Sequence, residues 1–297
     1  MKRAASDEVC LAVWTLSSLR REARKQERPD RTRSQLGAVL VGAPVENVLA
    51  LTGEVSAFAL RAVVDVFRRP FEGTQIRRQL AEIGSRSLPL VIASGFALGA
   101  VLTMHTRSTL VTFGATAWIP SVQALAFFLE IGPLVTGLLV AGRVGSGIGA
   151  VLSNMRATEQ IDAIEALSID SFKFLVVPRI VACTLALPIL TLFLDFSGFL
   201  GGFIAEYAAS RLSFHLYVLR AFSHFQLSNF IAPTLKTAVF GFVIGTVSSF
   251  LGYTTNEGAQ GVGRAATSSV VVSSLLIIVL DVLLIKLIFF IFPESAL

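Results

Sequence analysis

Long apolar runs that are nearly free of charge limit what this chain can fold into. A run of about 20 apolar residues is long enough to cross about 30 Å of hydrocarbon as a helix. The stretch 108–142 is too long for one span, so we place its first part, up to Pro120, outside the membrane. Five spans are then predicted, at about residues 87–106, 121–141, 180–205, 235–252 and 269–292. The predicted fold is an all-α integral membrane protein.

The composition agrees with this fold and excludes other classes. Of the 297 residues, 54% are hydrophobic and only 15% are charged, whereas soluble domains average about 25% charged residues. A water-soluble enzyme is therefore excluded, and so is intrinsic disorder, which requires low hydrophobicity. Cys10 and Cys183 lie far apart, and the three histidines are scattered. We predict neither a disulfide framework nor a metal site from these residues.

Basic residues are concentrated ahead of the first predicted span. Residues 1–86 hold 15 of the 25 Lys and Arg, against ten acidic residues. A basic terminus can bind nucleic acid, but beside long apolar runs it is better explained as the cytoplasmic side of a membrane protein. An odd number of spans then places the C-terminus in the periplasm. The fourth apolar run is readable from Thr237, so Lys236, just before it, is assigned to the outer segment between the third and fourth spans.

An amphipathic helix is predicted at residues 54–69. Apolar residues recur there at spacings of three and four, while Arg61, Asp65 and Arg68 lie on the other face, and Pro70 ends the pattern. We expect this helix at the membrane interface, with packing on a soluble domain as the alternative. Residues 1–53 form a basic cytoplasmic extension that we leave unassigned, and residues 54–297 form the membrane domain. A half-buried helix is also expected within 206–233, on the outer interface.

Three carboxylates fall within the predicted spans. Glu130 stands just before Gly132-Pro133, where we expect the second span to kink. A carboxylate in hydrocarbon is costly and usually faces the bundle interior or a water-filled cavity. We therefore predict that Glu130 lines a substrate cavity, with a purely structural hydrogen bond as the alternative.

Asp195 and Asp281 raise the possibility of an intramembrane aspartyl protease, because two embedded carboxylates can share a proton. The sequences around them, Leu194-Asp195-Phe196 and Leu280-Asp281-Val282, lack the motifs of such proteases. Interhelical polar contacts are the better explanation. For Asp281 we expect a Lys or Ser from a neighbouring helix.

The inner end of the second span is rich in glycine around Arg143. Gly145 and Gly149 are four residues apart, which permits close helix packing. A phosphate-binding loop is the alternative, but the Gly-Lys-Ser/Thr of a P-loop is missing. We predict that this chain does not hydrolyse ATP.

The inner segment 153–179 is predicted to contain a short helix with two unlike faces. One face is apolar (Ile161, Ile164 and Leu167) and the other acidic (Glu159, Asp162 and Glu165). A helix of this kind is suited to docking on a cytoplasmic partner. A solvated charged face is the alternative.

A series of ordered motifs resembles the MlaE/YrbE family of ABC-transporter permeases, which serve the MCE-protein lipid transport systems of double-membrane bacteria and chloroplasts. The motifs are Glu130-Ile-Gly-Pro133, Leu139-Val-Ala-Gly-Arg-Val-Gly145, Met155-Arg-Ala-Thr-Glu-Gln-Ile-Asp162, Ala166-Leu-Ser-Ile-Asp170, Val177-Pro-Arg179 and Gly263-Arg-Ala-Ala-Thr267. The resemblance extends over roughly residues 54–292. It implies a homodimer of five-span subunits in the bacterial inner membrane, each preceded by an interfacial helix.

The resemblance also implies partners. Two cytoplasmic ATPase subunits, which bind ATP and Mg, would dock through a coupling helix; this chain itself would bind no cofactor. The coupling residues carried over are Arg156, Glu159, Gln160, Asp162 and Glu165. A periplasmic ring of MCE-domain proteins is implied, and some systems add a STAS-domain protein. No nucleic acid is expected as a partner.

The cargo implied by the resemblance is phospholipid or a related lipid, held in a cavity at the dimer centre. Glu130 matches the family's glutamate near that cavity, with Leu129 and Pro133 beside it; some members have Arg where this chain has Leu129. Arg143, Asp195 and Asp281 are taken as structural polar residues of the membrane domain. The favoured function is thus the permease subunit of an ATP-driven lipid transporter, serving outer-membrane lipid homeostasis. A self-powered channel or secondary transporter, and a non-transporting membrane anchor of a cytoplasmic complex, are the alternatives.

Overall fold

The computed structural model describes residues 45–66, 73–223, 228–255 and 258–291, and all regular elements in these ranges are helices. Contacts divide the chain into a unit at residues 1–57 and a unit at residues 58–297, each considered by itself. The α-helices are α3 (Val45–Val66), α4 (Gly73–Thr112), α5 (Ile119–Ala126), α6 (Gly132–Val140), α7 (Ser146–Ala157), α8 (Gln160–Ala166), α9 (Val177–Ser210), α10 (Phe214–Ala221), α11 (Ser228–Thr254) and α12 (Gly258–Ile291).

Five helical segments are long and apolar enough to cross a membrane. They are Gly73–Thr112, Thr116–Ala157, Phe172–Ser210, Phe230–Thr254 and Gly258–Ile288. Each contains one predicted span or most of it, so the all-α, five-span prediction is confirmed. The helices run past the charged residues at which the apolar runs stop. The helix that contains the first predicted span begins at Gly73, and Pro120, which we placed outside the membrane, is part of the helical segment that contains the second predicted span.

The second span is interrupted by two π-helical turns. The turn Phe127–Ile131 separates α5 from α6, and the turn Ala141–Gly145 separates α6 from α7. Pro133 has no N–H to donate, and the N–H of Gly132 bonds to the carbonyl of Phe127, five residues back. The irregularity expected at Gly132-Pro133 is thus a π-turn, and Glu130 is part of it.

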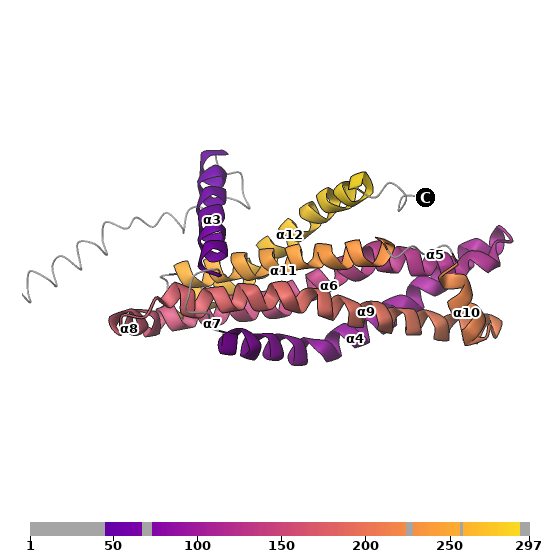
Figure 1. Ribbon diagram of the computed structural model, residues 1–297, viewed down its shortest axis with the longest axis horizontal. Coiled ribbons are helices and arrows are strands. Elements are labelled where there is room, and N and C mark those ends of the chain that lie inside the picture. The colour runs from indigo at the N-terminus through magenta and orange to yellow at the C-terminus, as the bar shows by residue number, and fades with distance from the viewer. Residues whose placement is uncertain (1–44, 67–72, 224–227, 256–257, 292–297) are drawn as a thin grey trace, which may run out of the picture. The chain divides into compact units, whose positions relative to one another are not determined.

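Helices α4 and α9 lie side by side with their backbones in contact (Figure 1). A Cβ atom at Gly99 would lie 1.9 Å from the carbonyl oxygen of Gly198, and one at Gly201 would lie 2.1 Å from that of Phe96. Small residues allow such close approach between membrane helices, where packing rather than water drives association. The close contact between α4 and α9 therefore requires glycine at these positions, because a side chain there would push the two backbones apart.

This contact gives a direct test. Gly99→Ala is expected to lower the free energy of unfolding by about 1–3 kcal/mol, because overpacking forces two backbones apart. Gly84→Ala is the matched control on the same helix, since a Cβ there meets nothing within 4 Å, and it is expected to be neutral or stabilising by up to about 1 kcal/mol. Thermal unfolding in detergent measures both. Equal melting temperatures of the Gly99→Ala and Gly84→Ala variants would contradict the close contact between α4 and α9.

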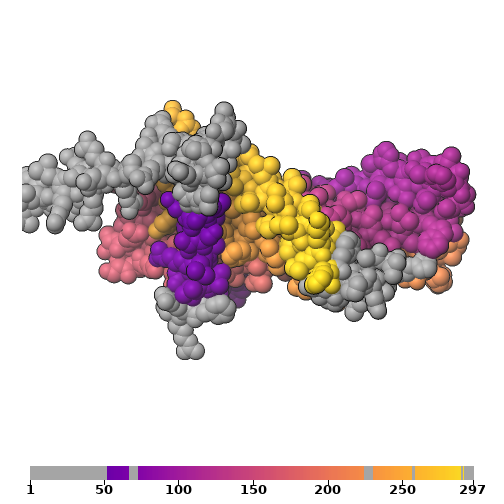
Figure 2. All heavy atoms as spheres, turned by 90° about the horizontal axis from the view of Figure 1, so that it is seen from above, coloured from indigo at the N-terminus to yellow at the C-terminus, as the bar shows by residue number. Residues whose placement is uncertain are grey.

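Helix α7 packs against α11 and α12 in the same manner. A Cβ at Gly145 would lie 3.0 Å from Ser248 Oγ, and one at Gly149 would lie 2.4 Å from Ser269 Oγ. The close packing predicted for this glycine pair is confirmed. Figure 2 shows α12 in yellow along one face of the molecule. Many of its exposed side chains are apolar, as on a surface that meets lipid or another apolar subunit: Val271, Leu275, Ile278, Val279, Val282 and Leu283.

Candidate functional site

Three charged side chains from three spans meet inside the membrane domain. The Nζ atom of Lys236, on α11, lies 2.9 Å from Glu130 Oε2 and 2.9 Å from Asp281 Oδ1. Glu130 comes from the π-turn of the second span, and Asp281 from α12. The side chains of Lys236 and Asp281 are 2% and 5% exposed, whereas that of Glu130 is 34% exposed. We call these three residues the charged triad.

The triad settles two expectations from the sequence. A Lys or Ser partner was predicted for Asp281, and Lys236 is that partner. The assignment of Lys236 to the outer segment is wrong, because it lies inside α11, six residues after the candidate span begins at Phe230. Two carboxylates in an apolar bundle require a cation, and Lys236 supplies it from the neighbouring helix.

The arrangement leaves one carboxylate open on one side. Lys236 donates a hydrogen bond to Glu130 Oε2, while the partial exposure of Glu130 leaves room for a second donor. One ammonium between two ionised carboxylates leaves a formal charge of −1. Leu129 is half-buried and Pro133 is buried beside it. The triad is therefore a polar group set into apolar surroundings, able to accept a hydrogen bond from a ligand.

Asp195 takes up a different position from the other two carboxylates. Its side chain lies against the π-turn, since a Cβ at Gly132 would fall 1.8 Å from Asp195 Oδ1. Asp195 is 1% exposed, and neither of its oxygens has a hydrogen-bond partner within the described ranges. The interhelical contact predicted for Asp195 is thus a packing contact with Gly132 and includes no hydrogen bond to a described residue. Arg143, which we grouped with it, is exposed at the second π-turn.

The α8 end carries the predicted coupling residues. Glu159 adopts a left-handed conformation (φ 58°) and turns the chain from α7 into α8. Arg156 pairs with Asp162 at 2.8 Å, while Glu159 and Gln160 are exposed. The carboxylate of Asp162 therefore has a partner within the chain. The carboxylate of Glu165 has one as well, because it accepts a hydrogen bond from Ser171.

The apolar face predicted for this segment is only partly correct. Ile161 is fully buried in the main core, and Ile164 packs against the same core. Leu167 is 74% exposed, because α8 ends at Ala166 and the chain turns away. Leu167 and Ile169 thus form an exposed apolar edge beside the acidic residues of α8.

The opposite end of the domain is fixed by buried polar pairs. Arg107 Nη1 lies 2.6 Å from Glu206 Oε1, and the Tyr217 hydroxyl donates to Gln123. Burial, with the nearby charge of Glu206 as a lesser cause, raises the pKa of Tyr217 well above its usual range. Tyr217 lies on α10, which has both buried and exposed residues. A half-buried helix within 206–233 is therefore confirmed, although residues 224–227 lie outside the described ranges.

Among the described residues, no three His, Cys, Asp or Glu side chains are grouped so that they could hold a metal ion.

Comparison with known proteins shows the family to which this chain belongs. The family model described as Permease MlaE matches residues 76–287, most of the chain. The chain belongs to the MlaE family of ABC transporter permeases. The family resemblance found in the sequence motifs is thereby confirmed.

Relatives from three kinds of organism show the breadth of the family. A probable ABC transporter permease protein of Rickettsia bellii is 39% identical over 237 residues, covering 80% of this chain and 92% of the relative. One from a Synechocystis strain is 34% identical, covering 76% and 86%. The chloroplastic protein TRIGALACTOSYLDIACYLGLYCEROL 1 of Arabidopsis thaliana is 31% identical, covering 77% and 66%.

Family membership fixes the general role of this MlaE permease. It is a multi-pass membrane protein and a subunit of an ABC transporter. ATP hydrolysis belongs to partner ATPase subunits and not to this chain.

Proposed function

We propose that this MlaE permease moves phospholipid or a related lipid between the bacterial inner membrane and a periplasmic MCE-protein carrier, for outer-membrane lipid homeostasis. The charged triad carries the proposal, because it sets one partly open carboxylate, Glu130, into an apolar membrane domain. A site for an amphiphile needs that combination of apolar walls and a few placed polar groups. The Arabidopsis relative bears the name of a glycolipid, which supports a lipid as cargo.

The proposed assembly is a homodimer with the lipid cavity at its centre, lined by Glu130, Leu129 and Pro133. The N-terminus and α8 face the cytoplasm, in keeping with the basic residues ahead of the first span. The C-terminus and α10 face the periplasm, where the MCE ring docks, and a STAS-domain protein accompanies the ATPase in some systems. Residues 1–53 are a cytoplasmic extension.

In the proposed mechanism, α8 is the coupling helix. ATP binding closes the partner ATPases and draws the two copies of α8 together. The second and fifth spans then narrow the cavity, and the lipid leaves toward the carrier. Four acidic side chains beside an apolar edge at Leu167 and Ile169 support α8 as the docking surface: Glu159, Asp162, Glu165 and Asp170.

Glu130→Gln tests the lipid site without dismantling the triad. The substitution leaves Lys236 and Asp281 as a charge-matched pair, so assembly and ATP hydrolysis are expected to persist. Lipid movement is expected to fall about tenfold, because a hydrogen bond to a charged group contributes about 1.5–3 kcal/mol. The measurement is transfer of labelled phospholipid by the complete complex in proteoliposomes. Glu82→Gln is the matched control, since Glu82 forms an exposed pair with Arg86.

The same assay separates the alternatives. Full transfer by Glu130→Gln would remove Glu130 from the lipid site. Transfer by the wild-type permease without its ATPase would favour a self-powered channel or secondary transporter. A complex that assembles with its ATPase and moves no lipid would favour a membrane anchor.

A further inference from the structure

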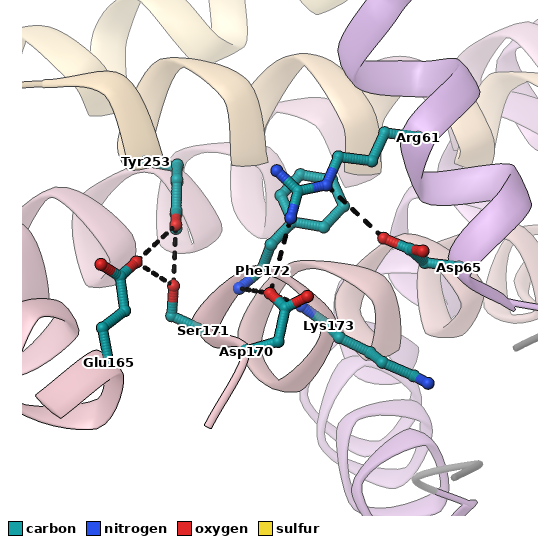
Figure 3. A network of polar contacts seen from close by, with 8 residues as sticks. All are labelled: Arg61, Asp65, Glu165, Asp170, Ser171, Phe172, Lys173 and Tyr253. Carbon is teal, nitrogen blue, oxygen red and sulfur yellow. Dashed lines mark hydrogen bonds and ion pairs between the residues drawn. The ribbon is translucent and has the colours of Figure 1, made fainter. Parts of the chain in front are cut away.

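Three side chains near the α8 end form a closed polar contact between α8, α11 and the start of the third helical segment, Phe172–Ser210 (Figure 3). Ser171 Oγ donates to Glu165 Oε1 at 2.6 Å and lies 2.8 Å from the hydroxyl of Tyr253. The Tyr253 hydroxyl is also 3.3 Å from Glu165 Oε1. Glu165 is in the last turn of α8, and Tyr253 is in the last turn of α11. We call these three residues the α8–α11 contact.

The next residues along the chain hold the start of the third span. Asp170 accepts hydrogen bonds from the backbone N–H groups of Phe172, at 3.1 Å, and Lys173, at 3.3 Å. The guanidinium of Arg61, from α3, lies 4.2 Å from the centre of the Phe172 ring and 3.6 Å from Asp170 Oδ1. A cation over an aromatic ring beside a carboxylate is attracted to both. The segment 170–172 is therefore held by α3 as well as by α8 and α11 (Figure 3).

The covalent link between α8 and the third span is a short, exposed turn. After α8 ends at Ala166, the chain passes through Ser168 in a left-handed conformation (φ 61°) before the helix resumes. Leu167, Ile169 and Asp170 are exposed in this turn. Backbone hydrogen bonds close the turn, from the Ser168 N–H to the Glu165 carbonyl at 3.0 Å and from the Ile169 N–H to the Ile164 carbonyl at 3.4 Å. This turn leads from α8 only to the start of the third span, whereas the α8–α11 contact joins α8 directly to α11, the helix that carries Lys236.

We infer that the α8–α11 contact transmits movement of the coupling helix to the charged triad. Helix α11 carries both Tyr253 and Lys236, and their 17-residue separation corresponds to about 25 Å along a helix. A displacement of Glu165 moves Tyr253, and α11 carries that displacement to Lys236 and so to Glu130. Glu165, Ser171 and Tyr253 are positioning residues in this scheme. The inference rests on the proposed role of α8 in docking the ATPase.

The test removes two hydroxyl groups and leaves the docking surface intact. Ser171→Ala with Tyr253→Phe abolishes the contact without adding charge or volume. Tyr207→Phe is the matched control, because Tyr207 stands at the far end of α9 and its hydroxyl makes no hydrogen bond with a described residue. An environment-sensitive fluorophore on Leu235→Cys, which is exposed on α11 next to Lys236, reports movement independently of the cargo. The background carries Cys10→Ser, and the native Cys183 is buried.

In the complete complex, a non-hydrolysable ATP analogue is expected to change the fluorescence in the parent and in Tyr207→Phe. In the double variant, we expect the nucleotide-dependent change in fluorescence to be smaller by about fivefold or more, since coupling between distant sites is typically fivefold or larger. ATPase binding is expected to stay normal. An equal response in the double variant would overturn the inference, and so would a parent probe that ignores the nucleotide. Neither result touches the proposed function, which fails instead if the wild-type complex transfers no lipid.

Discussion

Lys236→Met is expected to destabilise this permease more than any other single substitution considered. The change removes the ammonium that lies 2.9 Å from each of two carboxylates. Removing one partner of a buried ionic group costs about 3–5 kcal/mol, because the remaining charge is left uncompensated. We expect a large fall in the yield and melting temperature of the detergent-solubilised protein, measured by size-exclusion chromatography after heating.

Lys286→Met is the matched control for this substitution. Lys286 is the other described lysine of the α11–α12 pair, and its side chain is exposed. The same change of residue type there is expected to stay within about 0.5 kcal/mol of the wild type. Adding Glu130→Gln and Asp281→Asn to Lys236→Met is expected to restore much of the stability, since no charge then remains buried. If the melting temperature of Lys236→Met equalled that of the wild type, the triad would contribute nothing to the stability of the fold.

Reversing two charges on α8, with Glu159→Lys and Asp162→Lys, is expected to release the ATPase subunits. Both carboxylates are exposed, and like charges brought together across an interface cost several kcal/mol, so binding should weaken by about 100-fold. The loss of the Arg156–Asp162 pair, which is largely exposed on its Asp162 side, costs only about 0–1 kcal/mol. The permease should therefore still fold. The measurement is co-purification of the ATPase with the tagged permease.

Glu54→Lys provides a charge reversal on another helix, α3. Glu54 is exposed on α3, and we expect this variant to retain the ATPase. If the α8 variant retained it equally, these acidic residues would have no part in docking. Because the α8–α11 contact is left unchanged by the charge reversal, docking and transmission are tested by separate substitutions.

The sequence predicts the spans well because apolar runs of this length have few other stable solutions. Hydropathy fails at their ends, since a helix such as α4 continues through the charged residues that precede its apolar part. It also places Lys236 outside, because a lysine at the edge of an apolar run normally extends to the interface. Hydropathy alone does not show that Lys236 has carboxylate partners on other spans. Two carboxylates within the spans, Glu130 and Asp281, require a cation, and Lys236 supplies it from a neighbouring span.

The side-chain contacts around α8 lay beyond the sequence for a different reason. Spacing within one helix identified its acidic and apolar residues, but Ser171 and Tyr253 come from the start of the third helical segment and from a span more than 80 residues later in the chain. Their positions depend on how α8, α9 and α11 pack. The π-turn at Phe127–Ile131 was anticipated only as an irregularity, because Pro133 removes a donor without specifying how the backbone responds.

The order of the triad along the chain has a consequence for how the protein is made. Glu130 is synthesised 106 residues before Lys236, and Asp281 follows only in the last span. During insertion, the second span must therefore enter the bilayer while its carboxylate has no ammonium to pair with. A lone ionisable residue in a spanning helix is tolerated at a cost and favours later association with other helices. The acid in the second span thus stays unpaired until the fourth span has been made, and the triad is complete only once the fifth span follows.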